Sequence, residues 1–238
     1  MYETENRILT RTAAEQVAID QGLRAYMLRV YNYMASGLLL TGIVAYFVAN
    51  TPSLANAIFG TPLVWVVMLA PLAFVMVLSF GINRLSVGAA QAIYWVYCAT
   101  MGASLASILL VFTGASVARV FFITAATFGG MSLYGYTTRS DLSRFGSFLM
   151  MGLIGIILAS VVNIFIGSTA VQFAISVIGV LVFVGLTAYD TQRIKDIYLE
   201  SDDGETAGKK SLMGALTLYL DFINLFMLLM QLFGQRRE

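Results

Sequence analysis

The sequence contains no histidine and only one cysteine among its 238 residues. Without histidine the chain cannot form a His-ligated zinc site, a haem site with a histidine ligand, or a Ser-His or Cys-His nucleophile pair. The cysteine, Cys98, lies within an apolar run and cannot form an intrachain disulfide, so we interpret it as a buried, inert thiol. These enzyme classes are therefore excluded, and no cofactor is expected.

Charged residues are also scarce. They make up 11% of the chain, against about 25% in soluble domains, and hydrophobic residues make up 59%. This composition predicts a polytopic membrane protein whose first partner is the lipid bilayer. The net charge of +1 gives no indication of a nucleic-acid partner.

Seven apolar runs, each long enough to cross a bilayer as a helix, follow a polar N-terminal segment. They are 27–49, 63–80, 88–112, 117–136, 146–167, 171–192 and 212–233. The sequence therefore predicts an all-α membrane protein, with one seven-helix transmembrane domain over 25–238. Residues 1–24 are expected to form a solvated, mobile cytoplasmic tail, because they are polar and lack the short apolar core of a signal peptide.

The distribution of basic residues predicts the orientation. Of the 14 Lys and Arg residues, only Arg119, Arg236 and Arg237 fall on the side of the membrane opposite the N-terminus. Cytoplasmic loops carry an excess of Lys and Arg, so the N-terminus is predicted to be cytoplasmic and the C-terminus outside. Small residues four apart, Ala126 with Gly130 and Gly155 with Ala159, are further expected to allow close helix contacts.

The last run contains a single acidic residue, Asp221, about 16 Å along the helix from Lys210 and so near the middle of the bilayer. A carboxylate at that depth costs on the order of 3 kcal/mol on the most lenient insertion scale. Polar residues recur on the same helical face, so this face should point into the bundle or into a water-filled cavity. The residues of this face are Gly214, Thr217, Asp221, Asn224 and Gln231.

Asp190, near the end of the sixth run, is the only other acid within an apolar run. On straight, parallel helices the carboxyl groups of Asp190 and Asp221 would differ in depth by roughly 10 Å. They can meet only if the sixth helix continues past the membrane edge, with Arg193 and Lys195 lining a vestibule, or if the last helix begins later. Otherwise Asp190 is an interfacial acid paired with Arg193 or Lys195, and Asp221 a buried acid that ties helices together.

If the two carboxyl groups do meet, they cannot both ionise easily in a medium of low dielectric constant, so they should share a proton. Their oxygens also suit a hard cation such as Ca²⁺, which would compete with the proton. Such a pair could act as a pH-dependent gate and as a Ca²⁺ contact. Arg84, at the inner end of the second run, is either a counter-ion for the pair or an ordinary basic flank.

Two motifs carry a resemblance to a known family. Residues 189–192 read Tyr-Asp-Thr-Gln, and 218–226 read Leu-Tyr-Leu-Asp-Phe-Ile-Asn-Leu-Phe. Together with Ser132-Leu-Tyr-Gly and Arg139-Ser-Asp-Leu-Ser, they resemble the Bax inhibitor-1 family in its bacterial branch, over roughly residues 25–235.

The resemblance implies a seven-helix bundle with a central last helix. It also implies a pH-sensitive Ca²⁺ leak channel in the bacterial inner membrane, with Ca²⁺ as the permeant ion. Asp190 and Asp221 would be the pH sensor and part of the ion pathway, supported by Thr217 and Asn224, and Arg84 would be a candidate latch.

Two other functions remain open at this point. Some bacterial relatives are linked to the regulation of a membrane protease, so the chain could be a non-conducting regulator that binds another membrane protein. An intramembrane aspartyl protease also uses two aspartates on adjacent helices. Its second motif should read Gly-x-Gly-Asp, whereas this chain has Tyr219-Leu220-Asp221. We therefore expect no enzymatic activity.

Overall fold

The computed structural model describes the backbone of residues 2–237 and the side chains of residues 20–237. The described part of the chain forms eight helices and no strand. Their bounds are α1 Tyr2–Ala49, α2 Pro52–Phe59, α3 Leu63–Gly81, α4 Val87–Val111, α5 Gly114–Thr137, α6 Ser143–Ile166, α7 Thr169–Asp196 and α8 Gly204–Phe233. The predicted all-α class is confirmed.

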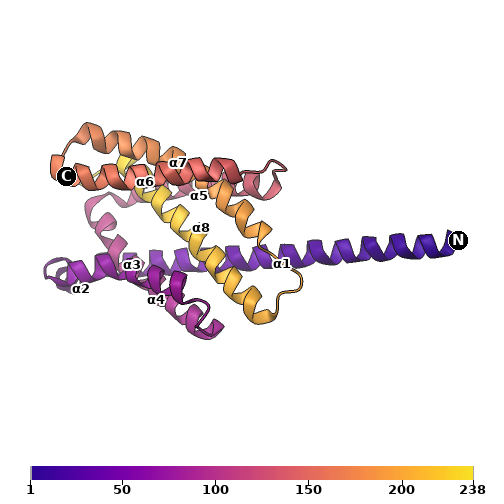
Figure 1. Cartoon of the computed structure of the whole chain (residues 1–238). Coiled ribbons are helices and arrows are strands. Elements are labelled where there is room, and N and C mark those ends of the chain that lie inside the picture. Colours follow the sequence, from indigo (N-terminus) through magenta and orange to yellow (C-terminus); the bar gives the residue numbers. More distant parts are fainter. Residues whose placement is uncertain (1, 238) are drawn as a thin grey trace.

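Seven of these helices are long and apolar enough to cross a membrane, and each contains one of the seven predicted runs or all but one residue of it. The short helix α2, in the first connection, was not predicted. The backbone of α1 is helical from Tyr2, so the segment predicted to be a mobile tail continues the first helix, which projects beyond the other helices (Figure 1). Helix α3 passes through Pro71.

Side-chain caps fix where several helices begin. An oxygen of the preceding Ser, Thr or Asp accepts a hydrogen bond from a backbone N–H of the first turn, which has no partner within the helix. Four helices begin in this way, with Ser86, Thr113, Ser168 and Asp203 as the capping residues. Gly167, in the left-handed conformation with φ 67°, ends α6 and allows the tight turn into α7.

Helix α8 is the centre of the bundle. It runs diagonally between a group formed by α1, α3 and α4 and a group formed by α5, α6 and α7 (Figure 1). It packs against α1, α4, α5 and α7. Within its most apolar stretch 72% of the residues are buried, compared with 11–39% in the other six spans. The expectation of a central last helix is confirmed.

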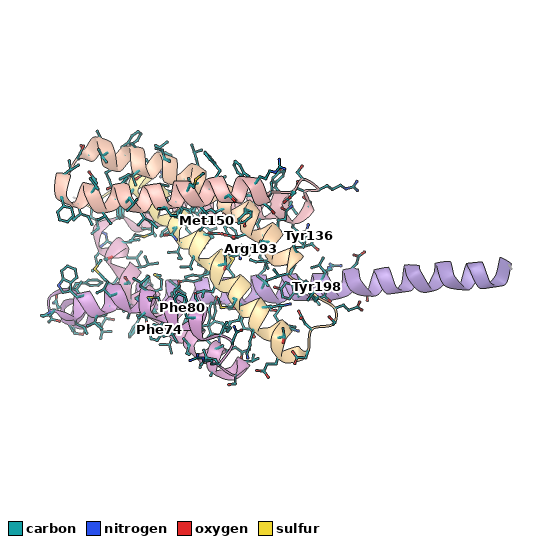
Figure 2. All side chains as sticks on the ribbon, viewed as in Figure 1. Phe74, Phe80, Tyr136, Met150, Arg193 and Tyr198 are labelled. Atoms are coloured by element: carbon teal, nitrogen blue, oxygen red, sulfur yellow. The ribbon has the colours of Figure 1, made fainter. Side chains whose placement is uncertain are left out.

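The outer surface of the bundle is largely aliphatic and aromatic, as Figure 2 shows around Phe80 of α3, whose side chain is 80% exposed. Close backbone contacts occur at Gly102, against Thr41 of α1, and at Gly135, against Ala188 of α7. A Cβ at Gly130 or Gly155 would meet no atom within 4 Å. The prediction that these two glycines make close contacts is therefore wrong within the chain, because both face outward.

Candidate functional site

A cavity of about 630 Å³ lies between α6, α7 and α8. Helix α6 contributes a wall that is apolar except for Ser160 and includes Met150 and Ile157, and α7 and α8 contribute the other polar side chains. Helix α6 packs on α7, and the cavity lies between α6 and the polar face of α8. The polar side chains in its wall are Ser160, Gln172, Asp190, Thr217, Asp221, Asn224 and Gln231.

The predicted polar face of α8 lines this cavity. Thr217, Asp221, Asn224 and Gln231 all belong to its wall, so the prediction that the face points into a cavity is confirmed for these four residues. Gly214, one turn earlier, does not line the cavity. It packs against Ile194 and Val30, where a larger side chain would meet their methyl groups.

Asp190 and Asp221 meet in the cavity, with their side chains in hydrogen-bonding contact. Asp221 is 4% exposed, and its Oδ2 has no hydrogen-bond partner among the usual donors of the described residues. Two carboxylates have no proton to share, so this contact becomes a hydrogen bond only when one of the groups is a carboxylic acid. A pair in this contact could hold one proton in common.

The structure also removes the predicted mismatch in depth. Helix α7 continues beyond Asp190 to Asp196, as the first of the two ways in which the pair could form requires, but Lys195, expected to line a vestibule there, donates to Tyr136 O. The second way is wrong, because α8 begins at Gly204, earlier than expected.

The neighbours of Asp190 in sequence hold it in place. The ring of Tyr189 lies against Gly146 of α6, where no side chain could be accommodated. Thr191 donates a hydrogen bond to Thr187 O and lies 3.0 Å from the hydroxyl of Ser132 on α5, which is bonded in turn to Tyr31 of α1.

Gln192, the last residue of the motif, joins α7 to the α5–α6 connection. Its amide donates to Ser140 O and accepts from Leu142 N–H. The Tyr-Asp-Thr-Gln motif therefore fixes α7 to α5, to α6 and to the loop between them, and only its aspartate faces the cavity.

A second polar cluster lies near the α6–α7 turn, at the end of the cavity away from the aspartate pair. Gln231 Oε1 accepts hydrogen bonds from Gln172 at 2.7 Å and from Ser176 at 2.8 Å. Asn163 donates to Gln172 and accepts from Ser168 N–H. Gln231 belongs to the predicted polar face, but its partners on α6 and α7 were not predicted, because isolated amides near helix ends carry no signal of their own.

Arg84 is not brought to the pair. It is exposed in the turn between α3 and α4, and α3 packs against α2 and α4 rather than against α7 or α8. The cation whose charge acts on Asp190 is Arg193, three residues further along α7 (Figure 2). Lys195 turns away and donates to Tyr136 O at 3.0 Å.

The cation-binding capacity of the site rests on the two carboxyl groups. No group of three or more His, Cys, Asp or Glu side chains comes together among the described residues. With two carboxylates and the neutral oxygens of Thr217 and Asn224 in the wall, the cavity can contact a hard cation such as Ca²⁺ without forming a closed ligand cage.

Comparison with known proteins agrees with the motifs. Residues 23–238 match the family described as inhibitor of apoptosis-promoting Bax1. The chain is 49% identical to the inner membrane protein YbhL of Escherichia coli, over 91% of this chain and 94% of that one. It is 47% identical to the protein RP147 of Rickettsia prowazekii, over 95% and 96% of the two chains, and 34% identical to a membrane protein of Streptococcus pyogenes, over 91% and 95%. The chain belongs to the Bax inhibitor family of membrane proteins.

Proposed function

We propose that the chain is a pH-sensitive leak channel for Ca²⁺ in the bacterial inner membrane, gated by the pair Asp190 and Asp221. The observation that carries the proposal is the contact of these two carboxyl groups inside a partly polar cavity, with Asp221 Oδ2 left without another partner. The inner-membrane location rests on the similarity to YbhL. The excess of Lys and Arg supports a cytoplasmic N-terminus and an outside C-terminus.

The proposed gate works by competition between protons and the cation. A pair that carries negative charge attracts and retains a divalent cation, and conduction requires a site that also lets the ion leave. As the pH falls, protons take the place of the cation, and the negative charge of the pair, on which the nearby Arg193 acts, is lost. Both changes favour release, so the leak should rise as the pH falls.

The ion pathway would continue along the polar face of α8. From the aspartate pair it passes Asn224 and reaches the cluster of Gln231, Gln172 and Ser176. These hydrogen bonds link α7 to α8 at the outer end of the proposed pathway. Opening would require Gln231 to separate from α7.

The test is Ca²⁺ flux into proteoliposomes as a function of pH. We expect the flux to rise as the pH falls, and Asp190→Asn or Asp221→Asn to abolish the flux or to make it independent of pH. Asp141→Asn is the matched control, because Asp141 is an exposed acid in the α5–α6 connection and should leave the pH response intact. Flux no greater than in empty liposomes would refute the channel.

A second candidate is a non-conducting regulator that binds another membrane protein. The observation that favours it is the outward position of Gly130 on α5 and Gly155 on α6, which have no neighbour within the chain. Small residues on a lipid-facing surface allow a foreign helix to approach closely. Absence of flux, together with loss of a co-purifying membrane protein in Gly130→Leu or Gly155→Leu, would support this role.

A further inference from the structure

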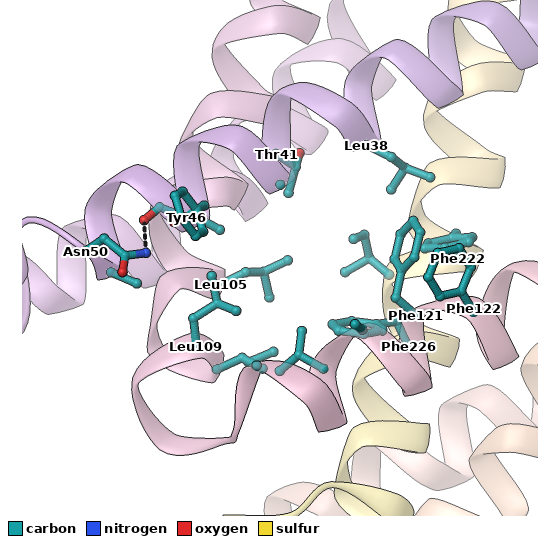
Figure 3. Close-up of a pocket in the computed structure, with 18 of the residues that line it drawn as sticks. Leu38, Thr41, Tyr46, Asn50, Leu105, Leu109, Phe121, Phe122, Phe222 and Phe226 are labelled. Atoms are coloured by element: carbon teal, nitrogen blue, oxygen red, sulfur yellow. Dashed lines mark hydrogen bonds between the residues drawn. The ribbon is translucent and has the colours of Figure 1, made fainter. Parts of the chain in front are cut away.

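A second cavity, of about 460 Å³, lies on the other side of α8. It is enclosed by α1, α4, α5 and α8, and it shares no lining residue with the aspartate cavity. Figure 3 shows Leu38, Thr41 and Tyr46 along α1, with Phe121 and Phe226 among the aromatic side chains opposite them. The proposed channel does not use this cavity.

The lining is apolar except at one end. Leucines, alanines and four phenylalanines form most of the wall, and no acidic side chain among the described residues belongs to it. Within that part of the chain Arg237 is the single charged residue of the lining, and Asn50 lies with it at the end of the bundle where α1 and α4 finish. The cavity therefore combines a long apolar interior with one positive charge.

The C-terminal segment places that charge. Residues 234–237 fold back along the α4–α5 turn, where Thr113 N–H donates to Gln235 O and Gln235 N–H donates to Ser116 Oγ. Arg237 donates its backbone N–H to Val111 O at 2.9 Å and its Nε–H to Phe112 O at 3.1 Å. The guanidinium is thus held beside the cavity by main-chain contacts.

Nothing in the described part of the chain neutralises this charge by an ion pair. Both ion pairs among the described residues, Lys209–Glu205 and Lys210–Asp202, lie at the opposite end of α8. An arginine guanidinium at a membrane surface matches the geometry of a phosphate, to which it can donate two parallel hydrogen bonds.

We propose that this cavity binds an anionic phospholipid from the leaflet on the side of the C-terminus. One acyl chain would occupy the apolar interior, and the phosphate would lie against Arg237. The volume is within the range of about 300–1,000 Å³ found for small-molecule sites. A lipid is the occupant that the charge pattern favours, because the cavity lies within the span of four membrane helices and offers one cation to an amphipathic anion.

Native mass spectrometry of the purified protein with phosphatidylglycerol and phosphatidylcholine of identical acyl chains tests the proposal. We expect phosphatidylglycerol to bind in preference by about fivefold, the effect of one basic residue near an anionic headgroup. Arg237→Gln should remove this preference. Arg236→Gln, the same change in charge one residue away at a position outside the lining, should retain it.

The acyl-chain part of the proposal has its own variant. Gly42 lines the cavity, and a Cβ there would meet no atom within 4 Å, so Gly42→Leu should fill the interior without a clash. It should reduce binding of both lipids, whereas Gly155→Leu, equally open but outside both cavities, should not. Equal binding of the two lipids by the unaltered protein would overturn the proposal. So would equal effects of the two arginine variants, unchanged binding in Gly42→Leu, or displacement of the lipid by inorganic phosphate.

Discussion

The contact between α5 and α7 at Gly135 sets the position of Asp190, and it can be tested by a single methyl group. A Cβ at Gly135 would lie 2.8 Å from the carbonyl carbon and 2.9 Å from the Cα of Ala188, and it would overlap the carbonyl oxygen. Favourable contacts of this kind are about 3.5–4.0 Å, so Gly135→Ala requires the two backbones to separate by about 1 Å. Ala188 is two residues from Asp190.

The magnitude follows from a comparison with Gly130→Ala on the same helix. In a helix the change from Gly to Ala gains about 1 kcal/mol of propensity at either position. Only Gly135→Ala adds an overpacking cost of about 1–3 kcal/mol, because Gly130 has no neighbour within 4 Å. The free energies of unfolding of the two variants should therefore differ by about 1–3 kcal/mol, or about 5- to 150-fold in the unfolding equilibrium.

Reversible unfolding in mixed micelles measures this difference, and Ca²⁺ flux against pH measures its consequence for the gate. We expect Gly135→Ala to unfold more easily than Gly130→Ala and to shift the pH response, since α7 carries Asp190 away from Asp221. If the two variants unfold alike and give the same pH response, the backbones of α5 and α7 do not touch at Gly135 and the reasoning fails.

Two further predictions concern polar contacts within the bundle. Thr41 accepts a hydrogen bond from the fully buried Tyr219 hydroxyl and donates to Cys98 O, so Thr41→Val should cost about 1–3 kcal/mol by orphaning that hydroxyl. The double variant Thr41→Val with Tyr219→Phe should lose less free energy of unfolding than the sum of the losses in the two single variants. Strictly additive losses in this double-mutant cycle would contradict the pairing. Asp203 caps α8 by accepting from Thr206 N–H, and hydrogen bonds from the side chain and the backbone of Thr206 hold the pKa of its carboxyl below the usual value. Its stabilising effect is present above the unfolded pKa and is lost as the pH falls through the folded one. Protection of the Thr206 amide from hydrogen exchange should therefore decrease as the pH falls. Equal protection at neutral pH in the unaltered protein and in Asp203→Ala would contradict the cap.

Much of the site could be predicted because lipid makes polar residues conspicuous. The spacing of Thr217, Asp221 and Asn224 within an apolar run was sufficient to assign one helical face to a cavity, and the structure confirms it. The contact of Asp221 with Asp190 could not be predicted from spacing, because it depends on how α7 and α8 are placed relative to one another. Helix rise gives distance along one axis and contains no information about the angle between two axes.

The face of α8 opposite its polar residues shows more generally what hydrophobic periodicity cannot predict in a membrane protein. Its Leu, Phe and Met residues suit either lipid or protein, and the structure buries Leu212, Phe222 and Met230 almost completely. In water an apolar face indicates the core, because exposure is costly. In a bilayer lipid tails are as apolar as leucine, so the same face has little preference between lipid and protein. The central position of α8 therefore depends on close packing, on interhelical hydrogen bonds such as Thr41 with Tyr219, and on the aspartate pair, none of which hydrophobic periodicity can report.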